Sequence, residues 1–211
     1  NRYLLRPSEE VNDLFVGVVG RAQELYGMRI CALTVLSTHY HMLLIPEDAE
    51  QLADFMEHVN GNLAREAGRL VGWRGRFWRE RCHGIPISPE PEALESRLRY
   101  VLSNTIKENL VARVSQWEGL HCAEALIDGK PMHGTWYDRS LEYEAKRQAG
   151  RRAARRGTAV EEVSRAAFMQ PYELKLAPLP CWQKLPPAAI RKKVAEIVTE
   201  IEAEAAERRK K

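Results

Sequence analysis

Two histidines separated by one residue, His39 and His41, are the best candidates in this chain for binding a metal ion. They lie in the run HYHMLLI, whose composition favours a β-strand. Alternate side chains of a strand point to the same face, so His39 and His41 would lie together while Tyr40 points to the other face. Two imidazoles held in this way can ligate one metal ion. The alternative is that both histidines simply occupy positions in a sheet, because H-x-H patterns are common.

Tyr100, 61 residues after His39, is a candidate nucleophile. A rotation of about 100° per residue along a predicted helix over 92–114 places Tyr100 away from the apolar stripe of that helix. The polar side chains on the same flank are Arg97, Asn104 and Lys107. A phenol is almost entirely protonated at neutral pH, so its attack on a phosphate needs a cation or metal ion that stabilises the phenolate.

Basic residues gather in two segments, although the formal net charge is only +3. The first, 71–83, interleaves aromatic side chains with Arg74, Arg76, Arg79 and Arg81. The second, 141–156, contains Arg151, Arg152, Arg155 and Arg156. Clustered cations can follow a phosphate backbone, and Trp73, Phe77 and Trp78 can either stack on bases or close the core beneath the loop. The alternative for each run is a solvated face.

Hydrophobic periodicity predicts the elements that position these residues. Apolar side chains at helical spacing predict helices over 9–26 and 48–69, the first between Ser8 as N-cap and Gly27. Two β-rich runs, RICALTVLS and HYHMLLI, lie between these helices, and a loop over 70–90 precedes the helix over 92–114. This order indicates an α+β fold in which antiparallel strands are covered by helices on one face.

The composition changes beyond residue 125, so we divide the chain into 1–125 and a C-terminal extension, 126–211. The extension holds a Gly- and Pro-containing loop, the second basic stretch, a proline-rich segment and a charged helix over 188–211. We interpret it as a mostly helical appendage wrapped on the core.

At 211 residues and 45% hydrophobic, the chain is long enough to bury a core. Its four cysteines are too widely spaced for a zinc module and suit the reduced thiols of a cytoplasmic protein. No apolar run approaches the length that crosses a bilayer, and Asn1 to Pro7 do not resemble a secretory signal, so we expect no membrane partner.

Three segments together, VLSTHYHMLLIP, WRGRFWRERCH and RYVLSNTIKENLV, resemble the single-tyrosine HUH transposases, in the branch associated with repetitive extragenic palindromes. In that family an H-hydrophobic-H strand supplies two metal ligands. A later helix supplies the nucleophilic tyrosine, with an amide side chain one turn further on as another ligand. The resemblance covers roughly residues 3–125, and Thr38 stands where family members usually have Asn.

The resemblance implies a ferredoxin-like antiparallel sheet and a metal-dependent endonuclease that moves single-stranded DNA next to hairpins through a 5′-phosphotyrosine intermediate. It implies Tyr100 as the nucleophile, and His39, His41 and Asn104 as ligands of Mg²⁺ or Mn²⁺. It also implies a bacterial cytoplasmic protein associated with the nucleoid, with a homodimer common among relatives. Two alternatives remain: a domesticated module that binds hairpin DNA or RNA without cutting it, and a metal-dependent hydrolase that uses water.

Overall fold

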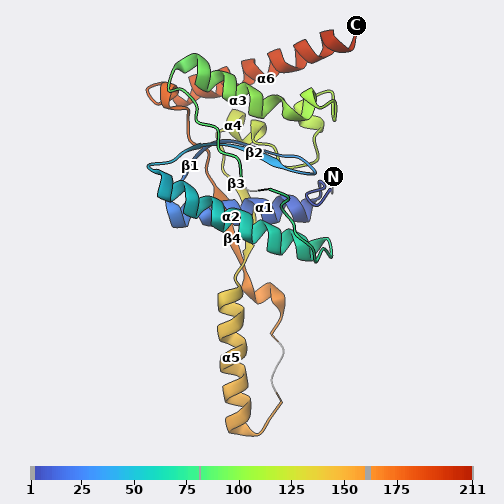
Figure 1. Cartoon of the computed structure of the whole chain (residues 1–211). Helices are drawn as coiled ribbons and strands as arrows, with labels where there is room; N and C mark the ends of the chain where they lie inside the picture. Colours follow the sequence, from blue (N-terminus) through green and yellow to red (C-terminus); the bar gives the residue numbers. More distant parts are fainter. Residues whose placement is uncertain (1–2, 81, 160–162, 211) are drawn as a thin grey trace.

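The computed structural model describes residues 3–80, 82–159 and 163–210. Figure 1 shows a layered body from which one helix, α5, extends as an arm. The helices are α1 (Glu9–Tyr26), α2 (Ala49–Leu70), α3 (Pro91–Lys107), α4 (Ala123–Asp128), α5 (Arg139–Arg156) and α6 (Pro187–Arg209). The strands are β1 (Arg29–Val35), β2 (Tyr40–Ile45), β3 (Met132–Tyr137) and β4 (Met169–Leu174). Short 3-10 turns occupy Val114–Gln116, Arg165–Phe168 and Pro180–Trp182.

The two N-terminal helices form where local capping residues predict them. The Ser8 side chain accepts a hydrogen bond from the backbone N–H of Val11 at 3.2 Å, and α1 ends at Gly27, whose φ of 65° lies in the left-handed region that glycine adopts freely. The Asp48 side chain caps α2 in the same way, accepting from Gln51 N–H at 2.8 Å. The predictions of helices over 9–26 and 48–69 are confirmed.

The third helix is shorter than the predicted 92–114. It begins at Pro91, whose fixed φ suits the first helical position, and it ends at Lys107. Asn109 has a φ of 54°, the only positive value at a non-glycine position in the described chain, and this left-handed residue stops the helix. The apolar residues after it belong to a loop and a 3-10 turn instead.

Strand β1 forms the centre of the first sheet. It pairs antiparallel with β2, with Thr34 opposite His41. Its other edge is hydrogen-bonded by two later segments: Cys122 N–H donates to Leu33 O at 3.0 Å, and Ala177 N–H donates to Ile30 O at 2.8 Å. Residues from beyond position 120 therefore complete an edge that would otherwise expose unpaired backbone groups.

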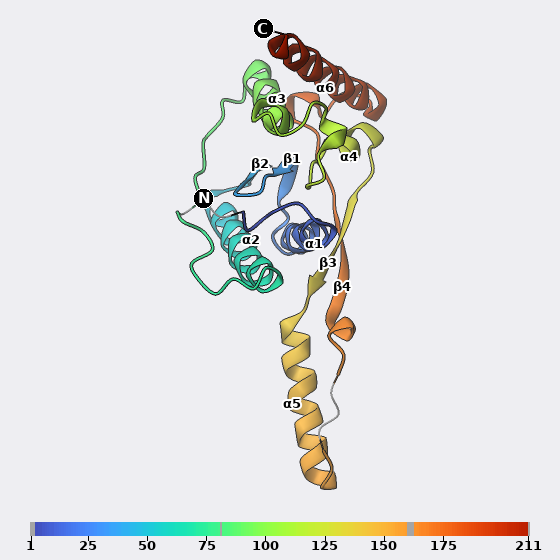
Figure 2. The same ribbon diagram turned by 90° about the vertical axis from the view of Figure 1, so that its right-hand side faces the viewer.

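Helices lie on both sides of the β1–β2 pair. In Figure 2, α1 and α2 lie on one side and α3 on the other, with α6 packed over α3. The sequence predicts helices on one face of the sheet. In the structure, α1 and α2 share one face, whereas α3 covers the opposite face. The predicted α+β class is confirmed, and the two small antiparallel sheets with their flanking helices are consistent with a ferredoxin-like sheet plus a helical extension.

The extension, 126–211, contacts the body through several of its elements. The β3–β4 ribbon packs closely on α1, where a Cβ added to Gly17 would lie 2.0 Å from the carbonyl oxygen of Thr135. Helix α6 packs on α3, and Arg99 donates to Glu200 at 2.7 Å and to Glu204 at 2.5 Å. Among the described residues, none of the helices combines the length and apolar character needed to cross a membrane.

Candidate active site

The two predicted metal ligands face each other at the start of β2. Their Nε2 atoms are 3.1 Å apart, so one ring nitrogen can donate a hydrogen bond to the other. His39 lies directly before the strand in a turn closed by Leu36 N–H, which donates to His39 O at 2.8 Å. His39 is exposed, whereas His41 is half-buried.

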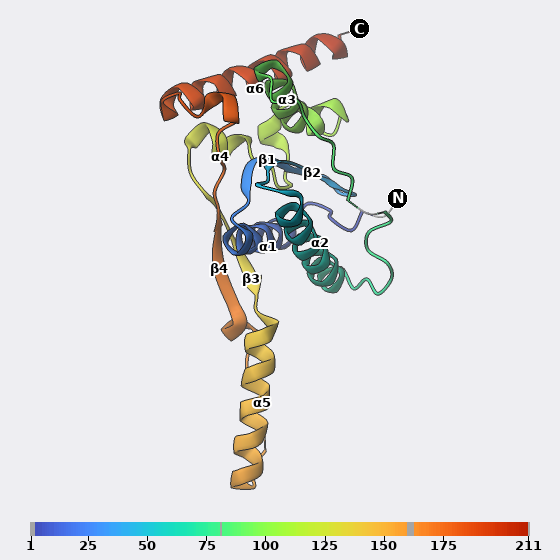
Figure 3. The ribbon, with the colours of Figure 1, turned by 60° about the vertical axis from the view of Figure 1, so that its left-hand side comes forward.

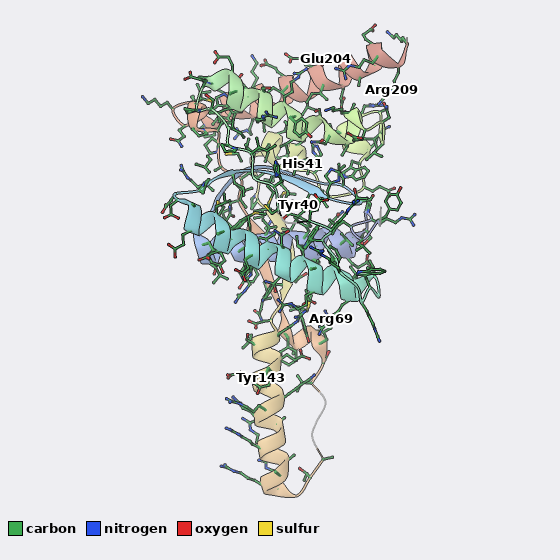
Figure 4. All side chains as sticks on the ribbon, in the orientation of Figure 1. Tyr40, His41, Arg69, Tyr143, Glu204 and Arg209 are labelled. Carbon is green, nitrogen blue, oxygen red and sulfur yellow. The ribbon has the colours of Figure 1, made fainter. Side chains whose placement is uncertain are left out.

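Tyr100 of α3 lies against this histidine pair. The rings of His41 and Tyr100 meet edge to face, with centroids 5.4 Å apart and planes at 85°. The ammonium nitrogen of Lys107 lies 5.0 Å from the centroid of the same tyrosine ring. Figure 4 shows His41 on the side of the strand that faces α3. The structure thus brings together two imidazoles, from β2 and the turn before it, with a phenol and an ammonium group from α3.

Tyr40 points to the opposite face of the sheet. Its hydroxyl donates to Asn60 Oδ1 of α2 at 2.7 Å, and its ring lies 5.3 Å from that of Phe15 in α1. Burial raises the pKa of the Tyr40 hydroxyl well above its ordinary value of 10. Tyr40 is therefore a packing residue held in its protonated form, and Tyr100 is the tyrosine that faces the histidines.

The Thr38 hydroxyl contacts the outer nitrogen of His39, with Oγ1 2.9 Å from Nδ1. A neutral imidazole carries one N–H and one lone pair. When Nδ1 donates to the Thr38 oxygen, the lone pair of His39 is on Nε2 and points toward His41. The sequence alone did not predict that Thr38 orients the His39 ring. The signal that could have suggested it is a hydroxyl next to a predicted metal ligand.

Asn104 lies one turn beyond Tyr100 but is 2% exposed, so it is buried rather than on an open polar flank. The reason is that α3 is covered by β1 and β2 on one side and by α6 on another. The amide nitrogen of Asn104 donates to Tyr100 O at 2.8 Å. The other polar atom of this side chain, Oδ1, carries the lone pairs that could bind a metal ion.

The surroundings of His41 favour the neutral form of its imidazole. Burial is the main cause that lowers the pKa of His41 below its ordinary 6.5, and the neighbouring His39 and Lys107 lower it further. Because only neutral imidazole has a free lone pair, this shift favours the form that can ligate.

The donor set can be compared with what a divalent ion requires. Two nitrogens at about 2.1 Å from one ion, at a right angle, would be about 3 Å apart, and the measured separation is 3.1 Å. The described residues contain no cluster of three or more His, Cys, Asp or Glu side chains suited to a metal. His39 and His41, with Asn104 Oδ1, would hold Mg²⁺ or Mn²⁺ only with oxygen donors from water or phosphate completing the shell.

The arginines of the 71–83 loop remain exposed. Arg74 and Arg76 are open to solvent, and Arg79 lies 3.6 Å from the exposed carboxylate of the neighbouring Glu80. Arg81 lies outside the described residues. Arg97 of α3 is also exposed.

The aromatics of that loop pack inward. Trp78 Nε1 donates to Asn60 O at 2.8 Å, and its ring lies 5.7 Å from that of Tyr40. Phe77 packs against Trp78 at 4.8 Å. Of the two readings of these aromatics, core closure beneath the loop fits the positions of Phe77 and Trp78.

The second basic cluster is far from the histidine pair in the fold. Figures 1 and 3 show α5 beyond the α1–α2 layer, whereas His41 faces α3 on the other side of the sheet. Along α5, the exposed cations near the far end are Arg151, Arg152, Arg155 and Arg156. These four residues do not join the site formed by His39, His41 and Tyr100.

Comparisons with protein-family models, with curated proteins and with solved structures find no match to this chain.

Proposed function

We propose that this chain is a metal-dependent endonuclease and strand transferase that acts on single-stranded DNA beside hairpins, with Tyr100 as nucleophile. The observation that carries the proposal is the meeting of His39, His41 and Tyr100, from elements far apart in the sequence, at one place between β2 and α3. Core packing alone does not require two imidazole nitrogens to face each other next to a phenol and an ammonium group.

The proposed reaction transfers a phosphate diester from DNA to the tyrosine. The Tyr100 hydroxyl loses its proton and its oxygen attacks phosphorus. The bond from phosphorus to the 3′ oxygen breaks, the 3′ oxygen takes up a proton, and the 5′ phosphate stays on Tyr100. A second 3′ hydroxyl reverses these steps, which rejoins DNA and frees the tyrosine.

The residues around Tyr100 have separate parts in this reaction. The Lys107 ammonium, 5.0 Å from the Tyr100 ring centroid, stabilises the phenolate as it forms. His39, His41 and Asn104 would hold Mg²⁺ or Mn²⁺, which when bound polarises the phosphate. Thr38 orients the His39 ring, and the bond from Asn104 to Tyr100 O fixes the turn of α3 that carries the nucleophile.

The DNA path follows from exposed cations. The loop arginines Arg74, Arg76 and Arg79 lie in the segment between α2 and α3 and are exposed, as is Arg97, so their side chains can reach phosphates. The resemblance of the chain to the single-tyrosine HUH transposases also supports our proposal of a bacterial cytoplasmic protein that is associated with the nucleoid and forms a homodimer.

The test is incubation of the full chain with end-labelled single-stranded hairpin DNA and Mn²⁺ or Mg²⁺, followed by a denaturing gel. A labelled band that migrates with the protein, and that protease removes, is the expected product. A free cut strand without a protein-linked band would show hydrolysis by water instead. Intact DNA that is nevertheless retained by the protein on a native gel would show a binding module that does not cut.

A further inference from the structure

Helix α5 is an exposed and strongly basic rod. It has 18 residues and is thus about 27 Å long. Ala153 is its one buried residue, and residues 141–156 carry six basic and two acidic side chains. The two acidic residues, Glu142 and Glu144, lie in the first turns of α5, so positive charge increases along this helix toward Arg156.

The base of the arm is fixed to the body. Asp138 caps α5 by accepting from Leu141 N–H at 3.0 Å. Arg139 donates to Glu66, a carboxylate of α2 that is 3% exposed, and Arg165 on the returning chain lies 3.5 Å from the same carboxylate. A buried charge that lost these partners would be costly, so the ion pairs hold the direction in which α5 leaves the β3–β4 ribbon.

The two sides of α5 differ in character. The less exposed positions Ala145, Ala149 and Ala153 share one side, as their spacing of four residues requires. Arg147 and Arg151 lie about 160° around the helix from Ala149, and Arg155 continues their row at the same spacing. The row Arg147, Arg151 and Arg155, which we call the outer arginine row, thus occupies the side away from the small residues.

We propose that α5 binds duplex DNA by lying in its major groove, so that the outer arginine row contacts backbone phosphates. A helix with its side chains is about 10–12 Å across, and the B-DNA major groove is about 12 Å wide. Among the described residues, acidic side chains pair with the cations of α5 only in its first turns, where Glu144 lies 3.8 Å from Arg147 and Glu142 lies 2.8 Å from Lys146. Charge complementarity and length therefore both match a polyanionic groove.

Duplex DNA fits this arm better than other nucleic acids. The major groove of double-stranded RNA is deep and too narrow for side chains to read, so a helix does not enter it. Single strands are bound on exposed aromatic platforms, whereas α5 carries only Tyr143. In the proposed function the duplex is the stem of the hairpin, held apart from the phosphate that Tyr100 attacks. The inference rests on that function for the choice of DNA but not for cleavage.

The test measures binding without cleavage, in chelator, to a blunt B-form duplex, to one of its strands and to the same sequence as double-stranded RNA. The arm variant is Arg147→Ala, Arg151→Ala, Arg155→Ala in the full chain. A matched control, Lys184→Ala, Lys192→Ala, Arg208→Ala, removes the same formal charge from exposed positions in and beside α6. Circular dichroism and the unfolding midpoint establish that both variants fold like the wild type.

The expected result is specific to duplex DNA. The arm variant should lose affinity for the DNA duplex, and its salt dependence should flatten by about 0.9 log units for each lost phosphate contact. Its affinity for the single strand and for the RNA duplex should change no more than in the control variant. Equal losses in arm and control variants, or equal losses on all three probes, would overturn the proposal. Adduct formation by the wild type on single-stranded DNA is measured in a separate assay. A failure of the α5 proposal in the binding experiment therefore does not decide whether Tyr100 is the nucleophile.

Discussion

The ring of Tyr100 stands edge-on to that of His41, with centroids 5.4 Å apart. This contact joins β2 to α3 across 59 positions of sequence. It places the one tyrosine of α3 beside the imidazole whose Nε2 is 3.1 Å from that of His39. The chemistry proposed for the chain depends on this relationship more than on any other.

The histidine pair predicts how activity depends on metal and pH. Adduct formation should require Mg²⁺ or Mn²⁺ and should fall on the acid side, because protonated imidazole cannot ligate. Because burial lowers the pKa of His41 below its ordinary 6.5, His41 keeps its ligating neutral form to lower pH than a free imidazole does. The measurement is the initial rate of adduct formation from about pH 8 to 5.

The control for this prediction is the double variant His39→Ala, His41→Ala, which should be inactive at every pH while still binding DNA in chelator. Full activity of the wild type in excess chelator, or of the double variant, would remove the metal ion from the reaction.

The loop arginines predict the binding of single strands. Arg74→Ala, Arg76→Ala, Arg79→Ala should weaken binding alike on matched and mismatched hairpins, because phosphate contacts carry no sequence information. The slope of log affinity against log salt should flatten by about 0.7 for each lost contact on single strands. Cleavage should fall together with binding, since these arginines lie in the segment that connects α2 to α3, the helix of Tyr100. A slope equal to that of the Lys184, Lys192, Arg208 control variant would show that the loop is a solvated face.

We expect protonation of His121 to make the fold less stable in acid. Its ring is held between Leu102 O, 3.1 Å from Nε2, and Ala123 N–H, which donates to Nδ1 at 3.1 Å. Burial lowers the pKa of His121 from 6.5 to about 4. A group whose folded-state pKa is depressed contributes stability above its unfolded pKa, and this is lost as pH falls through the folded value.

As the pH falls from 6.5 to 4, the contribution of His121 should therefore lower the free energy of unfolding by about 2 to 3 kcal/mol. Urea unfolding of the wild type and of His121→Gln at several pH values measures this contribution. The Asp and Glu residues that also titrate in this range are the same in both proteins, so their effect cancels in the difference. If the variant and the wild type lose the same free energy over this window, His121 is not buried as a neutral ring.

The close packing of β3 on α1 predicts that Gly17 cannot be replaced by a larger residue without loss of stability. Gly17→Ala would put a Cβ 2.0 Å from Thr135 O, a backbone atom that cannot move without shifting the ribbon. We expect a loss of stability at the upper end of the about 1–3 kcal/mol typical of overpacking. Gly150→Ala in α5 is the control, because nothing lies within 4 Å of its added Cβ, and it should be neutral or stabilising. Equal unfolding midpoints for both variants would contradict the close packing of the ribbon on α1.

Local signals explain which elements could be predicted from the sequence. Helix α1 was bounded correctly because Ser8 and Gly27 act within one turn of their own positions. The H-x-H alternation placed Tyr40 on the face away from His41 because strand geometry alone determines it. Hydrophobic periodicity extends the predicted helix past the end of α3, because the left-handed conformation of Asn109 leaves no mark in the pattern of apolar residues.

Long-range contacts explain what could not be predicted. The pairing of Cys122 and Ala177 with the edge of β1 joins segments about 90 to 150 residues apart, and no local pattern encodes it. The β3–β4 ribbon lies in segments that read as loop-like and proline-rich. Asn104 is buried because other elements pack on α3, and a helical wheel drawn for α3 alone does not show that packing.

The most direct test identifies the residue that carries DNA. The wild-type chain is incubated with single-stranded hairpin DNA and Mn²⁺, the adduct is digested with nuclease and protease, and the modified peptide is sequenced by mass spectrometry beside Tyr100→Phe. The prediction is a nucleotide linked through phosphate to Tyr100, with no adduct in Tyr100→Phe although that variant still binds the DNA. An adduct on Tyr137 or Tyr143, or adduct formation at the wild-type rate in Tyr100→Phe, would contradict it.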